Sequence, residues 1–122
     1  MTVQELYESI GGSYQSALRI LQMDRMIDRF IRKFIDDDTY GRLMDAYASN
    51  NHAGMFESSH AMKGVCANLG LDTLSALAGE VADEFRPGRE RKWDDAALAQ
   101  KLEELKMLYA KTQEGIRRYS AQ

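Results

Sequence analysis

The fold is decided by residues 51–85, which read NHAGMFESSHAMKGVCANLGLDTLSALAGEVADEF. In the first half of this stretch, small and apolar residues recur at alternating steps of four and three, at Met55, Ser59, Met62, Cys66 and Leu69. That spacing places them on one face of a helix that packs against other helices. The second half repeats the pattern with Leu74, Leu77, Val81 and Phe85. The stretch therefore predicts two amphipathic helices.

Capping residues set the limits of these two helices. Asn51 is a good N-cap for a helix over about 51–69. Gly70 suits the left-handed position that closes a helix, and Leu71 is the apolar residue just beyond it. Asp72 is placed to cap the next helix, over about 72–85. Two helices joined by so short a turn must be antiparallel neighbours.

Upstream and downstream of this pair, the sequence predicts two further helices. The acidic run at residues 36–38 is a solvated turn, and its last member, Asp38, is expected to cap a helix over 39–49. After the break at residues 86–88, Asp94 or Asp95 starts a helix over 95–118. The buried positions predicted on it are Leu98, Leu102, Leu105, Tyr109, Thr112 and Ile116.

The first 36 residues read as shorter helices, over about 3–9, 14–21 and 24–35. The third carries a predicted buried stripe of Met26, Ile27, Phe30, Ile31 and Phe34. No alternating strand pattern and no repeat is visible. The sequence thus predicts an all-α fold, an antiparallel up-and-down four-helix bundle over about 39–118 with additional short N-terminal helices over 1–36. We expect 1–122 to form a single domain.

Composition narrows the functional classes. A length of 122 residues fits one domain, and a net charge of −3 gives no general attraction to nucleic acid or anionic membranes. One cysteine excludes an internal disulfide, and two histidines argue against a His-rich metal centre. No signal peptide or membrane-spanning run is present. We expect a cytoplasmic monomer, and Met1 together with the short tail after the last helix favours a free-standing protein.

The outward face of the helix over 51–69 carries the candidate chemistry. At about 100° per residue, His60 shares this face with Lys63, Gly64 and Ala67. A glycine in the middle of a helix lowers helix stability by about 1 kcal/mol relative to alanine, so we expect Gly64 to serve a purpose that offsets this loss. Without a Cβ, Gly64 lets another protein approach His60, although it could instead serve close packing of a neighbouring helix. A neutral imidazole is a nucleophile near pH 7, and a lysine ammonium suits a phosphoryl group.

The string SHAMKGVCANLG at residues 59–70 resembles the signature of the histidine-containing phosphotransfer (HPt) family, H-x-L-K-G followed by N-L-G. The helix pair, the Asn51 cap and the N-terminal pattern from Leu6-Tyr7 to Gly11-Gly12 are also similar to that family. Met62 stands in place of the usual leucine, with little change of volume. Ser59 stands where a small apolar residue is common.

The resemblance implies that His60 accepts a phosphoryl group from an aspartyl phosphate on a response-regulator receiver domain and passes it to another receiver. It implies that Lys63 stabilises the phosphoryl group and that Gly64 gives the receiver access. Phe56, Ala67 and Asn68 are the predicted partner-binding residues. A hybrid sensor histidine kinase is the expected upstream partner. No cofactor is expected on this chain, and Mg²⁺ is expected on the receiver.

Several features leave alternatives open. Phe56 either completes the edge of the core or docks a receiver. The chain lacks the G-x-x-x-x-G-K-[ST] loop of ATP-binding proteins, so we expect a phosphocarrier and not a kinase. A helical adaptor that binds a partner without phosphate turnover is the alternative function. A metal or redox site built from His52, His60 and Cys66 fails because Cys66 lies on the core face while His60 points outward.

Overall fold

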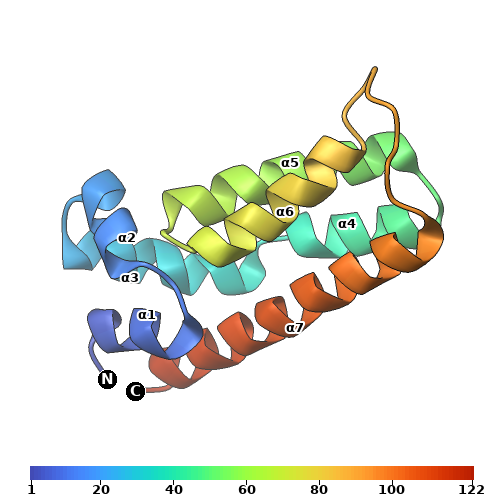
Figure 1. Ribbon diagram of the computed structural model, residues 1–122. Coiled ribbons are helices and arrows are strands. Elements are labelled where there is room, and N and C mark those ends of the chain that lie inside the picture. Colours follow the sequence, from blue (N-terminus) through green and yellow to red (C-terminus); the bar gives the residue numbers. More distant parts are fainter.

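The protein is entirely helical in the computed structural model, which describes residues 1–122 (Figure 1). Its helices are α1 (Val3–Ile10), α2 (Tyr14–Leu21), α3 (Asp24–Lys33), the short 3-10 helix η1 (Phe34–Asp36), α4 (Thr39–Ala48), α5 (His52–Asn68), α6 (Asp72–Glu84) and α7 (Asp95–Ser120). The predicted helix ends lie within two residues of these bounds. The prediction of an all-α fold is confirmed, and no helix is both long and apolar enough to cross a membrane.

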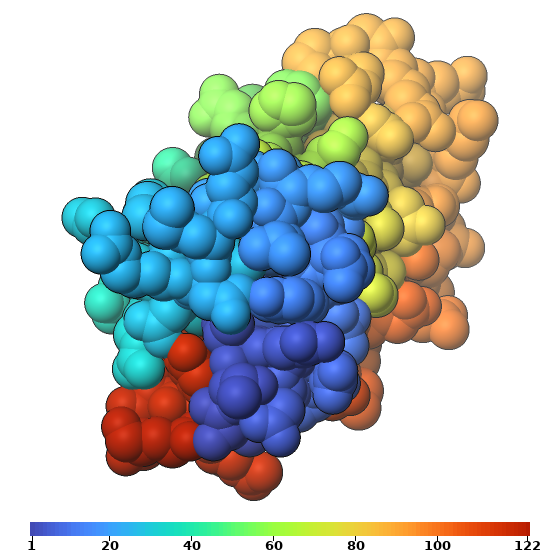
Figure 2. Space-filling view, turned by 90° about the vertical axis from the view of Figure 1, so that its left-hand side faces the viewer, coloured from blue at the N-terminus to red at the C-terminus, as the bar shows by residue number.

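Helices α4 to α7 form the antiparallel bundle, with α5 packed between α4 and α6 and with α7 running along the bundle (Figure 1). The N-terminal helices cover one end. Figure 2 shows this end, where α1 lies beside the last turns of α7 and α2 and α3 lie next to them. Buried residues from every α-helix join in one hydrophobic core. The bundle therefore holds α5 on two sides and leaves its remaining face free.

The N-cap and the buried face predicted for α5 are both present in the structure. The side chain of Asn51 accepts a hydrogen bond from the Gly54 N–H at 3.0 Å, as predicted for an N-cap. The five residues of the predicted buried face are at most 6% exposed. Among them, Ser59 satisfies its hydroxyl by donating to the Met55 carbonyl at 2.6 Å. A polar residue is thereby accommodated in the core without an unpaired group.

The N-terminal helices hold the C-terminal end of α5. Gly70 adopts the predicted left-handed conformation, with φ +71°, and its carbonyl accepts a hydrogen bond from the Ser13 N–H at 2.8 Å. The buried hydroxyl of Tyr7 donates to the Leu69 carbonyl at 2.6 Å. The Leu69 carbonyl, directly after α5, thereby gains a partner. Both contacts tie the end of α5 to residues far away in the sequence.

Two predicted caps are wrong. Asp38 makes no capping bond to α4; the carboxylate of Asp37 instead accepts the Thr39 N–H at 3.1 Å. Asp38 has φ −99° and ψ 0°, outside the extended conformation from which a cap reaches back. Asp72 lies within the first turn of α6, and its carboxylate accepts from the Ser16 hydroxyl at 2.7 Å. The Asp72 side chain therefore makes a tertiary hydrogen bond instead of a capping bond, and local sequence does not reveal such a contact.

Some residues of the predicted buried faces are only half-buried. Met26 and Phe30 lie where α3 packs at the end of the bundle, so solvent reaches their outer side. Leu77 and Tyr109 are half-buried as well. In α6, small side chains at Ala78 and Ala82 occupy the core beside Leu74 and Val81. Small residues at this contact allow α5 and α6 to approach closely.

Candidate functional site

His60 lies exposed on the free face of α5, opposite the buried Ser59 and Met62. Lys63 and Gly64 are exposed one turn further along the helix. Ala67 is half-buried and Asn68 exposed. The predicted direction of this face is therefore confirmed, and the structure brings the six predicted site residues together on one helix.

Gly64 faces open space. A Cβ built on it would meet no atom within 4 Å, so the glycine serves no packing contact within this chain. Two other helical glycines have no such space: a Cβ on Gly54 would lie 2.6 Å from Asn51, and a Cβ on Gly79 would lie 3.2 Å from Lys63. The alternative that Gly64 accommodates a neighbouring helix is therefore wrong. What remains is an unobstructed approach to the backbone beside His60.

Lys63 reaches across the contact between α5 and α6. Its aliphatic stem lies against Gly79, where a larger residue would crowd it. Its backbone carbonyl accepts a hydrogen bond from the Ser75 hydroxyl at 2.9 Å. Further along α6, the Arg86 guanidinium donates to Asp83 at 2.8 Å and lowers the pKa of that carboxyl, with a smaller contribution from Lys63. Lys63 therefore belongs to a group of charges along one flank of the His60 face.

Phe56 lies one turn before His60 and touches its ring. The two rings stack with centroids 5.5 Å apart and planes 18° from parallel. Phe56 is half-buried and also packs against the core, so it does complete the core edge, as one of the two interpretations held. The guanidinium carbon of Arg86 lies 5.5 Å from the centre of the Phe56 ring. The candidate nucleophile thus has an aromatic neighbour that a basic side chain contacts in turn.

The sequence reasoning did not place Arg86 and Asp83 at this site. The sequence predicted only a break in the helix at residues 86–88, and 26 positions separate Arg86 from His60 along the chain. The sequence nevertheless contained a signal for these contacts. If the chain is folded back at the turn after Asn68, Phe56 pairs with the end of α6 and Lys63 pairs with its middle. Counting outward from a short turn between antiparallel helices would have found both contacts.

The other reactive side chains lie apart from this face. His52, at the start of α5, packs its ring against Phe85 at 5.1 Å and has its Nε2 3.2 Å from the Asn50 amide oxygen. Cys66 is fully buried, and burial raises the pKa of its thiol to about 12. No group of three or more His, Cys, Asp or Glu side chains could hold a metal ion. The geometry therefore opposes the metal or redox site considered from the sequence.

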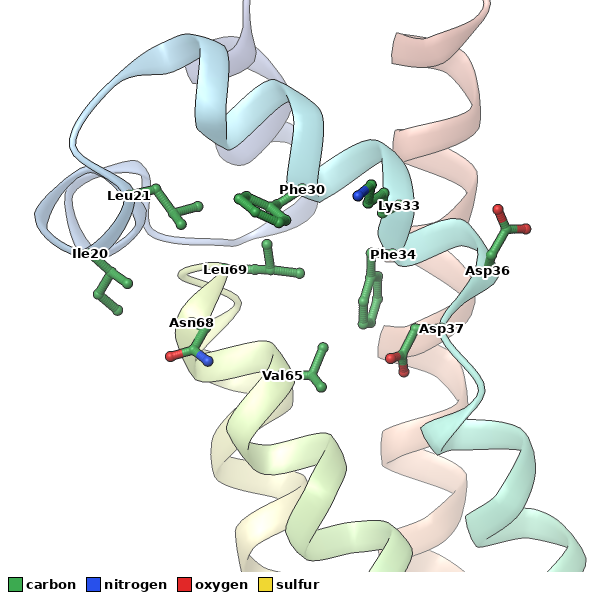
Figure 3. Close-up of a pocket in the computed structure, with 10 residues that line it drawn as sticks. All are labelled: Ile20, Leu21, Phe30, Lys33, Phe34, Asp36, Asp37, Val65, Asn68 and Leu69. Atoms are coloured by element: carbon green, nitrogen blue, oxygen red, sulfur yellow. The ribbon is translucent and has the colours of Figure 1, made fainter.

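The largest hollow on the surface, about 510 Å³, lies between α2, α3, η1 and the end of α5 (Figure 3). Its lining is mostly apolar, and the charged groups at its rim come from α3 and the segment after it. The lining residues are Ile20, Leu21, Phe30, Lys33, Phe34, Asp36, Asp37, Val65, Asn68 and Leu69. Asn68 is the one predicted site residue among them. His60 does not line this hollow and is exposed on an open helical face.

Comparison with known proteins gives one match. The family model of the Hpt domain matches residues 17–115, which is most of the 122-residue chain. No curated protein and no solved structure matches the chain.

Proposed function

This chain belongs to the Hpt domain family, whose members act as phosphocarrier modules in phosphorelays, and from that premise we propose that His60 is its phosphoacceptor. The observation that carries the proposal is the exposed imidazole of His60 beside a glycine with no neighbour within 4 Å. A protein partner carrying an aspartyl phosphate meets no side chain at Gly64 as it approaches the ring. His52 lacks such an opening, because its ring packs against Phe85.

The proposed reaction is a reversible transfer between nitrogen and oxygen. One nitrogen of the neutral His60 ring attacks the phosphorus of an aspartyl phosphate on a receiver domain. As the P–N bond forms, the P–O bond to the aspartate breaks, and its electron pair leaves with the carboxylate. The positive charge on the phosphorylated ring is relieved when its other nitrogen releases a proton. The reverse sequence, with the carboxylate of a second receiver as nucleophile, passes the phosphoryl group on.

This chain contributes a nucleophile, a charge and an open approach. Phosphoryl transfer depends on alignment in line with the leaving group and on neutralising the charge that spreads over the phosphoryl oxygens. Lys63 is exposed one turn from His60, and we assign it that charge neutralisation. We propose that the phosphate is taken from another protein, as the phosphocarrier role of the family implies. We assign the Mg²⁺ ion of the reaction to the receiver and its acidic pocket.

The partner surface that we propose extends along α5 on both sides of His60. Phe56, Ala67 and Asn68 are half-buried or exposed there and share the outward face. We propose that a receiver seated over Gly64 covers all three. We further propose that the protein acts as a cytoplasmic monomer, that a hybrid sensor histidine kinase lies upstream of it, and that it binds neither nucleic acid nor membranes.

A transfer assay tests the proposal. The protein is incubated with receiver domains carrying radiolabelled aspartyl phosphate, and the label on the chain is tested for stability. We expect label that acid removes and base does not, which is lost in His60→Gln and kept in the matched control His52→Gln. Circular dichroism should show both variants folded. Label of wild-type intensity on His60→Gln would contradict the proposal, and receiver binding without any transfer would favour the adaptor function.

A further inference from the structure

Three side chains form a continuous contact that ends at His60. The Phe56 ring stacks on the imidazole with centroids 5.5 Å apart, and the Arg86 guanidinium lies 5.5 Å from the centre of the Phe56 ring. Both separations fall in the range where aromatic stacking and cation–π attraction are favourable. Phe56 belongs to α5 and Arg86 to the end of α6, so the contact joins two helices beside the candidate nucleophile.

Arg86 is itself held in place from α6. Its guanidinium, just after the end of α6, donates at 2.8 Å to Asp83 in the last turn of that helix. The loop that follows is anchored by Glu84, whose buried carboxylate accepts the backbone N–H groups of Lys92 at 3.0 Å and Trp93 at 2.7 Å. This anchor holds the far end of the loop against the bundle. At the near end, the ion pair with Asp83 is the contact that holds Arg86 beside Phe56.

We propose that Phe56 is a positioning residue for His60, orienting the imidazole by stacking and held for that purpose by Arg86. The proposal rests on the phosphoacceptor role of His60. The χ2 torsion of an exposed histidine has a broad distribution, so its reactive nitrogen samples many directions. Stacking on Phe56 restricts the ring to planes close to that of the phenyl group. Since transfer requires a nitrogen in line with the breaking bond, this restriction raises the fraction of productive encounters.

A purely apolar role for Phe56 makes a different prediction. If Phe56 only fills the core edge or only docks a receiver, leucine serves nearly as well, because it is apolar and of adequate size. If the aromatic face orients His60, leucine fails and tyrosine succeeds. Phe56→Leu and Phe56→Tyr therefore form a matched pair that separates positioning from packing and docking.

The experiment measures single-turnover transfer from a phosphorylated receiver over a range of receiver concentrations. For Phe56→Leu we expect the rate constant at saturation to fall about two- to tenfold, from the usual strength of an aromatic pair. Because Phe56 also lies on the proposed partner surface, the saturated rate constant, and not the half-saturating concentration, is the readout of positioning. Phe56→Tyr, which keeps an aromatic ring, should have the wild-type rate constant. In proton NMR, the ring signals of His60 should lose their phenyl-induced shift in Phe56→Leu and keep it in Phe56→Tyr. Thermal unfolding verifies that the variants are folded.

Arg86 provides a second arm with its own control. Arg86→Gln should lower the saturated rate constant, as Phe56→Leu does. Arg89→Gln, three residues later in the segment after α6 and without a contact to the Phe56 ring, should not lower it. A wild-type saturated rate constant in Phe56→Leu, or a change in its half-saturating concentration alone, would overturn the positioning role. Equal losses in Arg86→Gln and Arg89→Gln would overturn the part assigned to Arg86. Wild-type protein that accepts no label at His60 would instead overturn the proposed function, and the positioning role with it.

Discussion

Replacing Gly64 by alanine should make the free protein more stable and should slow phosphoryl transfer from a receiver. The added methyl group meets no atom within 4 Å and lies in the middle of α5, so no contact opposes it. Alanine is favoured over glycine in a helix interior by about 0.8–1.0 kcal/mol. We therefore expect Gly64→Ala to raise the free energy of unfolding by about 1 kcal/mol and the melting temperature by about 4 °C. Urea and thermal unfolding followed by circular dichroism measure both quantities.

The same methyl group should obstruct a receiver. Inserting a methyl group into a closely packed contact typically costs about 1–3 kcal/mol, which corresponds to about a 5- to 150-fold loss in the second-order rate constant for transfer. Phosphorylation of His60 by phosphoramidate, a small donor with no protein surface, should stay at the wild-type rate. The comparison of the two donors isolates the approach of the partner from the reactivity of the ring.

Gly41 supplies the matched control. It is an exposed glycine in α4, and a Cβ on it also meets no atom within 4 Å. Gly41→Ala should stabilise the protein without slowing transfer from the receiver. The reasoning is refuted if Gly64→Ala lowers stability, or if it stabilises the protein and still accepts phosphate from the receiver at the wild-type rate.

Three further predictions concern the parts of the fold that hold the site. Gly70→Ala should lower the free energy of unfolding by about 2–5 kcal/mol, because φ is +71° and the new Cβ would lie 2.5 Å from a backbone oxygen; an unchanged urea midpoint would contradict this. Tyr7→Phe should lower it by about 1–3 kcal/mol by leaving the Leu69 carbonyl unpaired, and a loss below 0.5 kcal/mol, roughly, would argue against that bond. Burial raises the pKa of Cys66 from 9.0 to about 12, so between these values the folded chain keeps a proton that the unfolded chain releases, and stability should fall by up to about 1.4 kcal/mol per pH unit. Unfolding measured across this range should show a shallower decline in Cys66→Ala, and equal slopes would refute the assignment.

Most of the fold could be predicted from the sequence because local signals and tertiary demands coincide along α5 to α7. The alternating steps of four and three, the cap at Asn51 and the left-handed Gly70 all describe the structure correctly. The caps assigned to Asp38 and Asp72 were wrong because the carboxylate at each site had a competing neighbour. Asp37 was better placed than Asp38, and Asp72 bonds to Ser16, which lies 56 residues away.

The candidate site divides in the same way. The outward direction of His60, Lys63 and Gly64 follows from the rotation per residue of a single helix, and the structure confirms it. The contacts of Arg86 and the hollow between α3 and α5 depend on how separate helices pack (Figure 3). Periodicity along one helix carries no information about its neighbours. The open space beside Gly64 likewise became certain only once every surrounding side chain was in place.

The central claim is that His60 carries phosphate from one receiver to another. The most direct measurement is a chase: the labelled protein is separated from the first receiver and mixed with a second, unlabelled receiver. We predict that the label leaves His60 and appears on an aspartate of the second receiver, and that peptide mapping before the chase places it on His60 alone. Label that stays on the chain, or that maps to His52 or to any other residue, would contradict the account.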